Sequence, residues 1–265
     1  MNPVDKSIIE ESALRLRAVY DGAAPITPLN EVIPADDVES AYAVQNLNTE
    51  YWLGQGRMLT GRKIGLTSHA VQRQMGVDQP DFGMLFSDMA YADDEEVPMS
   101  RLYQPKVEGE IAFVLGKDLG SEHLTLIDVI SSIDYVLPAI EVVDSRIVDW
   151  KIKIMDTIAD NASSGLYVLG SVPVRLSDFD HRLCGMVMEH NGEPIATGAG
   201  AACLGNPLWS TLWLARKLVE VGRPLIAGDT VLSGALGPMS PAQAGGVYEL
   251  RISGLGSVRA AFSLK

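Results

Sequence analysis

Lys106-Val-Glu-Gly-Glu-Ile-Ala-Phe-Val-Leu115 is a largely apolar run that carries two glutamates, Glu108 and Glu110. A second apolar run, Val136-Leu-Pro-Ala-Ile-Glu-Val-Val143, carries a third, Glu141. Both runs are typical of β-strands, in which residues two apart point to the same face of the sheet. We therefore expect Glu108 and Glu110 to project side by side, and a neighbouring strand would add Glu141 to them.

Three carboxylates among residues that favour burial need a positive partner, because an unpaired buried charge is costly. A divalent metal satisfies all three at once, and carboxylate ligands suit hard ions such as Mg²⁺ or Mn²⁺. The alternative is that Glu108 and Glu110 form the solvent-exposed face of an amphipathic strand. Because Glu141 lies inside a second apolar run, we favour a metal site formed by Glu108, Glu110 and Glu141.

The N-terminal part of the chain has a helical pattern. Apolar residues at three- and four-residue spacing predict a helix over residues 8–20, and Asp36-Asp37 can cap a second helix over 38–52. The segments that follow are predicted to be a strand (61–67), a small helix (68–75) and a turn (Gln79-Pro-Asp-Phe-Gly83).

The rest of the chain consists mainly of strand patterns. Two helices interrupt them, one at 128–133 and one at 207–221, and Asn191-Gly192 is a strong signal for a hairpin turn. We therefore predict an α+β protein with an N-terminal helical segment over residues 1–60 and a β-rich catalytic domain over residues 61–265.

The composition limits the partners of this protein. The chain has 265 residues and a net charge of −13, which disfavours binding to nucleic acid or to an anionic membrane. Its two cysteines are typical of reduced thiols, and the chain shows neither a signal peptide nor an apolar run long enough to span a membrane. We expect a cytoplasmic protein, in which an anionic substrate would need a metal or a well-placed cation.

Two residues are candidates for proton transfer. Lys63 is a long cation in the short, glycine-flanked strand Gly61-Arg-Lys-Ile-Gly65, and burial near a metal would lower its pKa. The alternative for Lys63 is a solvated lysine at the end of a strand. Asp81, in Gln79-Pro-Asp-Phe-Gly83, is either a second proton carrier or an ordinary capping residue of a turn.

Three other segments could contribute to a ligand site. Arg146, Lys151 and Lys153 could supply positive potential, although a solvated surface is the simpler explanation for the two lysines. Residues 160–165, Asp-Asn-Ala-Ser-Ser-Gly, form either a polar wall for a ligand carboxylate or an ordinary turn. Residues 233–238, Ser-Gly-Ala-Leu-Gly-Pro, lack the lysine and the spacing of a phosphate-binding loop, and the four histidines show no ligand spacing.

Five motifs occur in order between about Val38 and the end of the chain. Together they resemble the 2-keto-4-pentenoate hydratase (2-hydroxypenta-2,4-dienoate hydratase) group of the fumarylacetoacetate hydrolase superfamily. The motifs are Gly61-Arg-Lys-Ile-Gly-Leu-Thr-Ser, Gln79-Pro-Asp-Phe-Gly, Val107-Glu-Gly-Glu-Ile-Ala, Pro138-Ala-Ile-Glu-Val-Val-Asp-Ser-Arg and Ala159-Asp-Asn-Ala-Ser.

This resemblance implies a mixed, rolled β-sheet core and a divalent cation, Mg²⁺ or Mn²⁺, held by the three glutamates. It also implies that Lys63 and Asp81 are catalytic and that Ser163, Leu85 and Ser233 contact the substrate. Enzymes of this group act in meta-cleavage degradation of aromatic compounds and form homo-oligomers. A decarboxylase or aldolase of the same pathway is a further expected partner.

The expected reaction is the addition of water to 2-hydroxypenta-2,4-dienoate, the enol of 2-oxopent-4-enoate, to give 4-hydroxy-2-oxopentanoate. The first alternative is 4-oxalocrotonate (2-oxo-3-hexenedioate) decarboxylase, whose second carboxylate could pair with Arg62, Arg146 or Lys151. A hydrolase of carbon–carbon bonds is a further alternative, but no histidine lies in a suitable motif. The last is a noncatalytic metal-binding scaffold, which would have no use for Lys63 beside Asp81.

Overall fold

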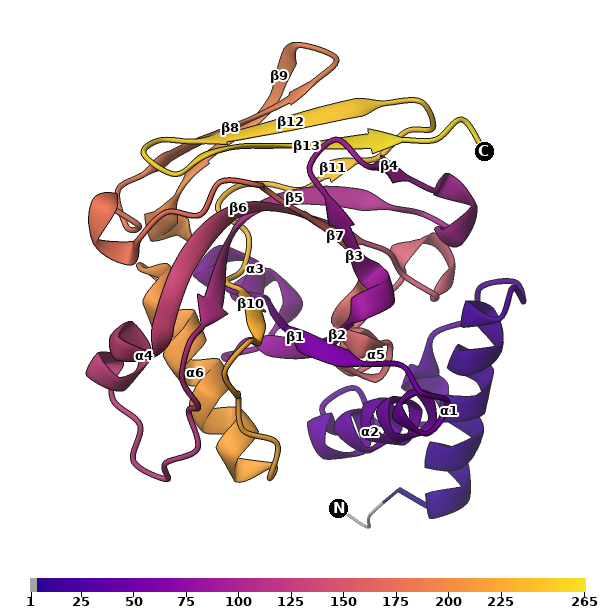
Figure 1. Ribbon diagram of the computed structural model, residues 1–265. Helices are drawn as coiled ribbons and strands as arrows, with labels where there is room; N and C mark the ends of the chain where they lie inside the picture. The colour runs from indigo at the N-terminus through magenta and orange to yellow at the C-terminus, as the bar shows by residue number, and fades with distance from the viewer. Residues whose placement is uncertain (1–3) are drawn as a thin grey trace.

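The computed structural model describes residues 4–265, which form two β-sheets flanked by helices (Figure 1). The larger sheet contains β1 (Leu59–Gly65), β2 (Asp81–Phe86), β3 (Ala90–Ala92), β5 (Lys106–Leu115), β6 (Ile133–Val143), β7 (Ser164–Leu169), β10 (Thr230–Leu232) and β11 (Ser240–Pro241). Its order is β2-β1-β10-β5-β6-β7-β3, and β11 pairs with β5. The β1–β10 and β3–β7 pairs are parallel and the others are antiparallel, so the sheet is mixed.

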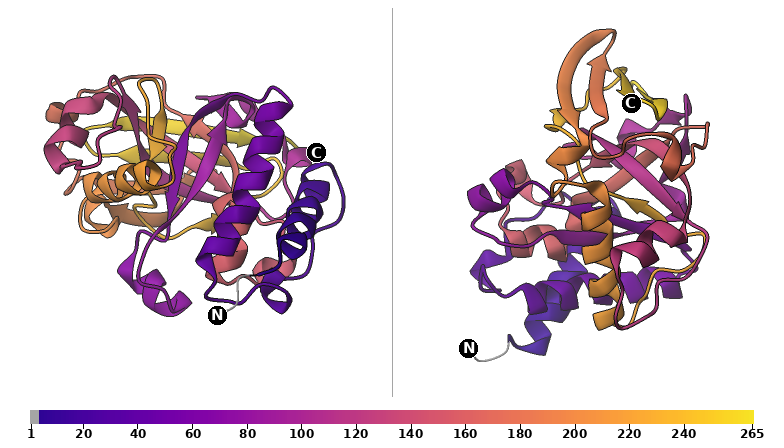
Figure 2. Two further views of the ribbon diagram at one scale, coloured as in Figure 1. Left: turned by 90° about the horizontal axis from the view of Figure 1, so that it is seen from below. Right: turned by 90° about the vertical axis from the view of Figure 1, so that its left-hand side faces the viewer.

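The smaller sheet covers the long central strands of the larger one. It contains β4 (Glu96–Val97), β8 (Gly185–His190), β9 (Glu193–Ala199), β12 (Val247–Ile252) and β13 (Gly256–Phe262), in the order β4-β13-β12-β8-β9. β12 and β13 pack against β6, and a Cβ on Gly109 of β5 would lie only 2.6 Å from Leu250 of β12. The missing side chain at Gly109 thus allows the two sheets to approach closely, while the β8–β9 hairpin projects from the body (Figure 2).

Six α-helices border the larger sheet in the described part of the chain. They are α1 (Lys6–Tyr20), α2 (Val38–Gly54), α3 (His69–Met75), α4 (Leu126–Ser132), α5 (Ile154–Ala159) and α6 (Pro207–Glu220). α1, α2 and α5 share a hydrophobic cluster of their own, whereas α6 packs against α4 on another side of the molecule (Figures 1 and 2). α5 leads through a short 3-10 turn, Asn161–Ser163, into β7.

The α+β class and the rolled sheet predicted above are confirmed. The larger sheet curls so that β1 and β2 lie across from β5 and β6 (Figure 1). The predicted start of the second helix also agrees with the structure, since Asp37 caps α2 by accepting a hydrogen bond from the amide of Ser40 at 3.0 Å. The proposed division of the chain at residue 60 stays a prediction.

The turn predicted at residues 79–83 is wrong. Asp81, Phe82 and Gly83 belong to β2 and pair with β1, and the apolar run Phe82–Phe86 is buried as part of this strand. Gly83 favoured a turn in the sequence analysis, but in the structure it permits close packing of the backbone. A Cβ at this position would overlap the carbonyl oxygen of Asn161, so glycine allows the 3-10 turn to lie directly against β2.

The state of the two cysteines and the character of the helices can be compared with the sequence analysis. Cys184 and Cys203 are buried and unbridged, as the sequence predicted. Among residues 4–265, none of the helices combines the length and the apolar character that crossing a bilayer requires.

We predict that Gly83→Ala destabilises the protein by about 1–3 kcal/mol, because the new methyl group must displace backbone atoms of the 3-10 turn. Gly54→Ala is the matched control, since a Cβ at Gly54 meets no atom within 4 Å. Urea unfolding of the two variants tests the prediction. Equal midpoints for Gly83→Ala and Gly54→Ala would contradict it.

Candidate active site

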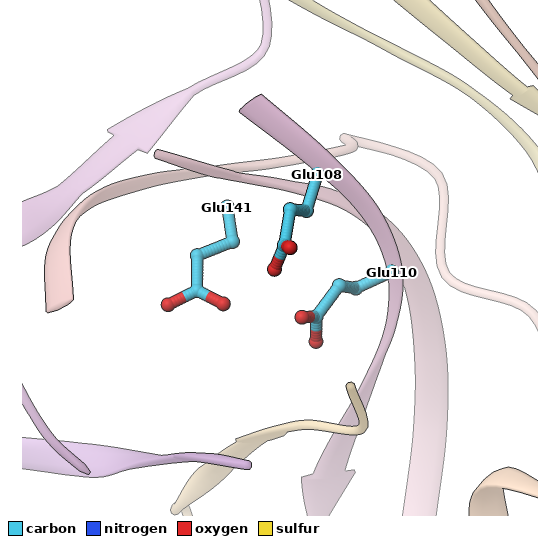
Figure 3. A group of neighbouring side chains, drawn as sticks. All are labelled: Glu108, Glu110 and Glu141. Carbon is cyan, nitrogen blue, oxygen red and sulfur yellow. The ribbon is translucent and has the colours of Figure 1, made fainter. Parts of the chain in front are cut away.

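The three glutamates meet because β5 and β6 are antiparallel neighbours. Glu108 lies directly opposite Glu141 in the strand register, and Glu110 lies two residues farther along the same face of β5. One carboxylate oxygen from each residue lies within 4.8 Å of the others, and the three side chains point toward one another (Figure 3). Glu110 and Glu141 are buried and Glu108 is partly exposed, so these side chains do not form a solvated face.

These carboxylates have few hydrogen-bond donors of their own. Oε2 of Glu110 accepts a hydrogen bond from the amide of Gly234 at 2.7 Å, and Oε1 of Glu141 lies 3.0 Å from the ammonium of Lys63. Oε1 of Glu110 and Oε2 of Glu141 have no hydrogen-bond partner among the described residues. Burial and the neighbouring Glu141 raise the pKa of Glu108 to about 7 and hold the pKa of Glu110 well above its usual value. Clustered, buried oxygens without donors fit a hard divalent cation such as Mg²⁺ or Mn²⁺.

Lys63 lies next to this cluster. Its side chain is 4% exposed, its Nζ lies 3.0 Å from Oε1 of Glu141, and the same atom donates a hydrogen bond to the carbonyl of Ala162 at 3.0 Å. Burial lowers the pKa of Lys63, but attraction to Glu141 and the other nearby carboxylates has the larger effect and raises it above its ordinary value. The alternative of a solvated lysine is therefore excluded by the structure, and Lys63 has a fixed place beside the carboxylates.

Asp81 is also buried and is not a capping residue of a turn. It faces Gly65 across the β1–β2 pair, and a Cβ on Gly65 would overlap Oδ1 of Asp81. Oδ2 accepts a hydrogen bond from the hydroxyl of Thr157 at 3.0 Å, whereas Oδ1 has no partner among the described residues. Burial raises the pKa of Asp81, and the nearby ammonium of Lys63 opposes this shift. The carboxyl group can therefore hold a proton more readily than an exposed aspartate.

The 3-10 turn after α5 positions Lys63. Asn161, Ala162 and Ser163 have φ values of 53°, 52° and 53°, and left-handed backbone in such residues costs about 1–3 kcal/mol each. The side chain of Asn161 holds the turn on β2, since it accepts from the amide of Met84 at 2.7 Å and donates to its carbonyl at 2.9 Å. The strained turn is thereby pinned where its Ala162 carbonyl meets Lys63, a role that the sequence analysis missed.

The three residues predicted to contact substrate lie in different settings. Ser163 is buried, and its hydroxyl has no hydrogen-bond partner among the described residues. Leu85 is buried on the same face of β2 as Asp81. Ser233 is also buried, and its neighbour Gly234 binds Glu110. Contact of Ser163, Leu85 and Ser233 with substrate stays a prediction.

Three cationic side chains were considered as partners for an anionic ligand, and each is paired with another group or points to another face of the protein. Arg62 lies within β1 on the face opposite Lys63, and Arg146 donates from Nε to Oδ1 of Asp160 at 2.7 Å. The side chain of Lys151 is 66% exposed and pairs with Asp149. The positive charge expected from Arg146 is therefore used to hold Asp160 at the end of α5.

Lys106 shares the face of β5 with Glu108, and the sequence analysis did not consider it. Its Nζ lies 4.1 Å from the centre of the Trp150 ring, so a cation–π contact holds the ammonium group on that ring. Lys106 still lowers the pKa of Glu108, although burial and Glu141 outweigh this effect.

Comparison with known proteins supports this description. Residues 59–263 match the family described as fumarylacetoacetate (FAA) hydrolase, C-terminal. A protein named TodF product hydratase from Pseudomonas putida is 59% identical over 94% of this chain and 93% of its own length. A 2-keto-4-pentenoate hydratase from Paraburkholderia xenovorans is 53% identical, covering 96% of this chain and 94% of that protein.

A solved structure is also similar over almost the whole chain. The 4-oxalocrotonate decarboxylase from Pseudomonas putida, complexed with magnesium and adipate, has a TM-score of 0.94 and 35% identity. The match covers 99% of this chain and 100% of that one. A divalent metal in this relative agrees with the cluster of three glutamates in this chain, whose carboxylate oxygens could hold such an ion.

We predict that Mg²⁺ binds more tightly as the pH rises from about 6 to 8, because Glu108 and Glu110 must lose protons before they can bind a metal. The midpoint should lie near 7, the value to which the pKa of Glu108 is raised. Calorimetric titration in buffers of different ionisation enthalpy measures the affinity and the protons released. Affinity that does not change over this range would contradict the prediction.

The metal-free protein should show the opposite pH trend in stability. The pKa of Glu108 is raised from 4.5 to about 7 on folding, so this group stabilises the folded state fully below pH 4.5 and loses its contribution as the pH rises through 7. Urea unfolding in a chelator at several pH values tests this, with Glu108→Gln as the variant that lacks the titrating group. An equal pH dependence in the wild type and Glu108→Gln would count against it.

Proposed function

The chain belongs to the fumarylacetoacetate hydrolase family, and on this premise we propose that it is a metal-dependent hydro-lyase. It adds water to 2-hydroxypenta-2,4-dienoate, the enol of 2-oxopent-4-enoate, and forms 4-hydroxy-2-oxopentanoate. This reaction belongs to the meta-cleavage degradation of aromatic compounds, and relatives at 53–59% identity are named as hydratases.

The observation that carries this proposal is the buried Lys63 beside the glutamate cluster. Its Nζ lies 3.0 Å from Glu141, and Asp81 is close enough to shift its pKa. Hydration of a dienol needs groups that deliver and remove protons near a bound anion. A purely structural metal site gains nothing from a buried lysine and a buried aspartate, so a noncatalytic scaffold explains these residues less well.

The charge of the site favours a substrate with one carboxylate. The protein has a net charge of −13, so an anion is attracted only where local positive charge exceeds the surrounding negative charge. Of the cations discussed above, Lys63 lies against the glutamates, and Arg146 is already paired with Asp160. Arg146, one candidate partner for a second carboxylate, is therefore used within the protein.

Glu108, Glu110 and Glu141 would hold the divalent cation. When bound, Mg²⁺ or Mn²⁺ supplies positive charge for the carboxylate of the substrate and polarises its C2 oxygen. The uncommitted hydroxyl of Ser163 and the loop carrying Ser233 are assigned to orient the substrate, and Leu85 is assigned to its apolar carbon chain.

Lys63 and Asp81 carry the protons of the reaction. The enol first loses its hydroxyl proton and gains a proton at C5, which leaves a double bond between C3 and C4. Water then adds its oxygen at C4 and gives up one proton, and C3 receives a proton. Protonation of C5 and of C3, and removal of a proton from the attacking water, each need a titratable group close to that atom. Lys63 and Asp81 are the two buried groups assigned to these transfers.

The decarboxylase alternative has one specific observation in its favour. The decarboxylase structure has a TM-score of 0.94 and was solved with adipate, a dicarboxylate. Its identity to this chain is 35%, however, against 53–59% for the two hydratases described above. The higher identity to the two hydratases favours the hydratase.

A spectrophotometric assay with Mg²⁺ or Mn²⁺ separates these two functions. The enzyme is offered 2-hydroxypenta-2,4-dienoate and, separately, 2-oxo-3-hexenedioate. We expect metal-dependent loss of the dienol absorbance with formation of 4-hydroxy-2-oxopentanoate, and no CO₂ from the diacid. Release of CO₂ would instead assign the chain to the decarboxylases.

We predict that Lys63→Ala lowers kcat at least about a hundredfold, the usual scale for losing a group that transfers a proton. The variant should lose stability, because Lys63 is the buried ion-pair partner of Glu141, but it should still bind Mg²⁺ through the three glutamates. Lys151→Ala is the control, since that lysine is 66% exposed. Wild-type turnover by Lys63→Ala would remove Lys63 from the mechanism.

Assembly and location stay proposals. We propose a homo-oligomer, contact with a decarboxylase or aldolase of the same pathway, and a cytoplasmic location, and we expect no binding to nucleic acid or membranes. The strongly acidic composition supports the last point. Sedimentation of the purified protein tests the oligomer directly.

A further inference from the structure

Thr157 lies behind Asp81, outside the residues assigned above. It is buried on α5, and its hydroxyl oxygen lies between two hydrogen-bond partners. The distance from Oγ1 of Thr157 to Oδ2 of Asp81 is 3.0 Å, and the distance to the carbonyl oxygen of Ile154 is 2.8 Å.

A hydroxyl group has one proton to donate, whereas both neighbours of this one are oxygens. The Ile154 carbonyl can only accept. If Asp81 is ionised, it can also only accept, and Thr157 can donate to one neighbour at a time. If Asp81 carries its proton on Oδ2, it donates to Thr157, which then donates to Ile154. The short distances on both sides can therefore be hydrogen bonds together only when Asp81 is neutral.

The surroundings of Asp81 leave Thr157 as its side-chain hydrogen-bond partner among the described residues. Oδ1 has no hydrogen-bond partner among the described residues, and the backbone of Gly65 lies against it. The titratable groups that interact with Asp81 from neighbouring elements are Lys63 on β1, Glu108 on β5, Glu141 on β6 and Tyr42 on α2. None of these four is its hydrogen-bond partner, so Thr157 is the side chain that responds directly to its protonation.

We propose that Thr157 is a positioning residue whose hydroxyl turns between Ile154 and Asp81 during the reaction. It accepts from the neutral carboxyl group while donating to Ile154, and it donates to Asp81 once the carboxylate has formed. Asp81 thereby keeps one hydrogen bond at Oδ2 in both states, and no other group has to move. This inference rests on the proposed function, in which Asp81 gives up and regains a proton in each cycle.

Thr157→Val removes the hydroxyl and keeps the shape of the side chain, while Thr157→Ser keeps the hydroxyl. Hydrogen bonds to charged groups contribute about 1.5–3 kcal/mol, which corresponds to a fall in kcat of at least about tenfold for Thr157→Val. KM and the affinity for Mg²⁺ should stay within about twofold, because substrate and metal bind elsewhere. Thr157→Ser should recover most of the turnover.

A direct titration of Asp81 tests the inference without substrate. The full-length protein with Mg²⁺ is labelled with ¹³C at the aspartate carboxyl groups, and the Asp81 signal is identified by its loss in Asp81→Asn. The bond from Thr157 to the ionised carboxylate is stronger than the bond to the neutral acid and lowers the pKa of Asp81 in the wild type, so Thr157→Val should raise that pKa. Thr157→Ala, which also lacks the hydroxyl, serves if the valine variant does not fold.

The two measurements separate failure of this inference from failure of the proposed function. An unchanged or lowered pKa of Asp81 in a folded variant without the hydroxyl would overturn the role of Thr157. Equal losses of kcat in Thr157→Val and Thr157→Ser would do the same. If the wild-type enzyme does not hydrate the dienol, the proposed function fails, but the titration still decides whether Thr157 responds to Asp81.

Discussion

The repulsion among three buried carboxylates is the constraint on which the rest of this structure depends. Glu108, Glu110 and Glu141 are brought together by the pairing of β5 with β6, and Glu110 and Glu141 are buried. Such an arrangement is stable only if positive charge is supplied. Lys63 supplies part of it, the amide of Gly234 supplies a dipole, and a divalent cation completes the balance.

The groups around this cluster are arranged by close backbone approach. Gly65 leaves room for the carboxyl group of Asp81, and Gly83 leaves room for the strained turn that begins at Asn161. The carbonyl of Ala162 in that turn accepts a hydrogen bond from Lys63. The preceding helix, α5, carries Thr157, whose hydroxyl is hydrogen-bonded to Asp81. Lys63 and Asp81, the two proposed proton carriers, therefore both have contacts to one short stretch of chain that runs from α5 to the start of β7.

The same distribution of charge bears on substrate choice. A family that includes hydratases and a decarboxylase can use one metal site for several 2-oxo acids, and the fold alone does not separate them. Sequence identity separates them here, since the chain is 53% identical to the hydratase and 35% identical to the decarboxylase. Arg146, a candidate partner for a second carboxylate, is paired with Asp160.

The sequence by itself determined the class of fold, the pairing of Glu108 with Glu110 on one face, and the candidates Lys63 and Asp81. These follow from local rules, namely the two-residue period of strands and the unusual position of charges between glycines or within apolar runs. It misassigned residues 79–83 as a turn, because a glycine needed for close packing resembles a glycine needed for a bend. Only the tertiary structure decided the register of Glu108 on Glu141, the partners of Arg146 and the contact of Thr157 with Asp81. Those contacts join residues far apart in the chain, and their distances depend on how the whole sheet curls and not on any local pattern.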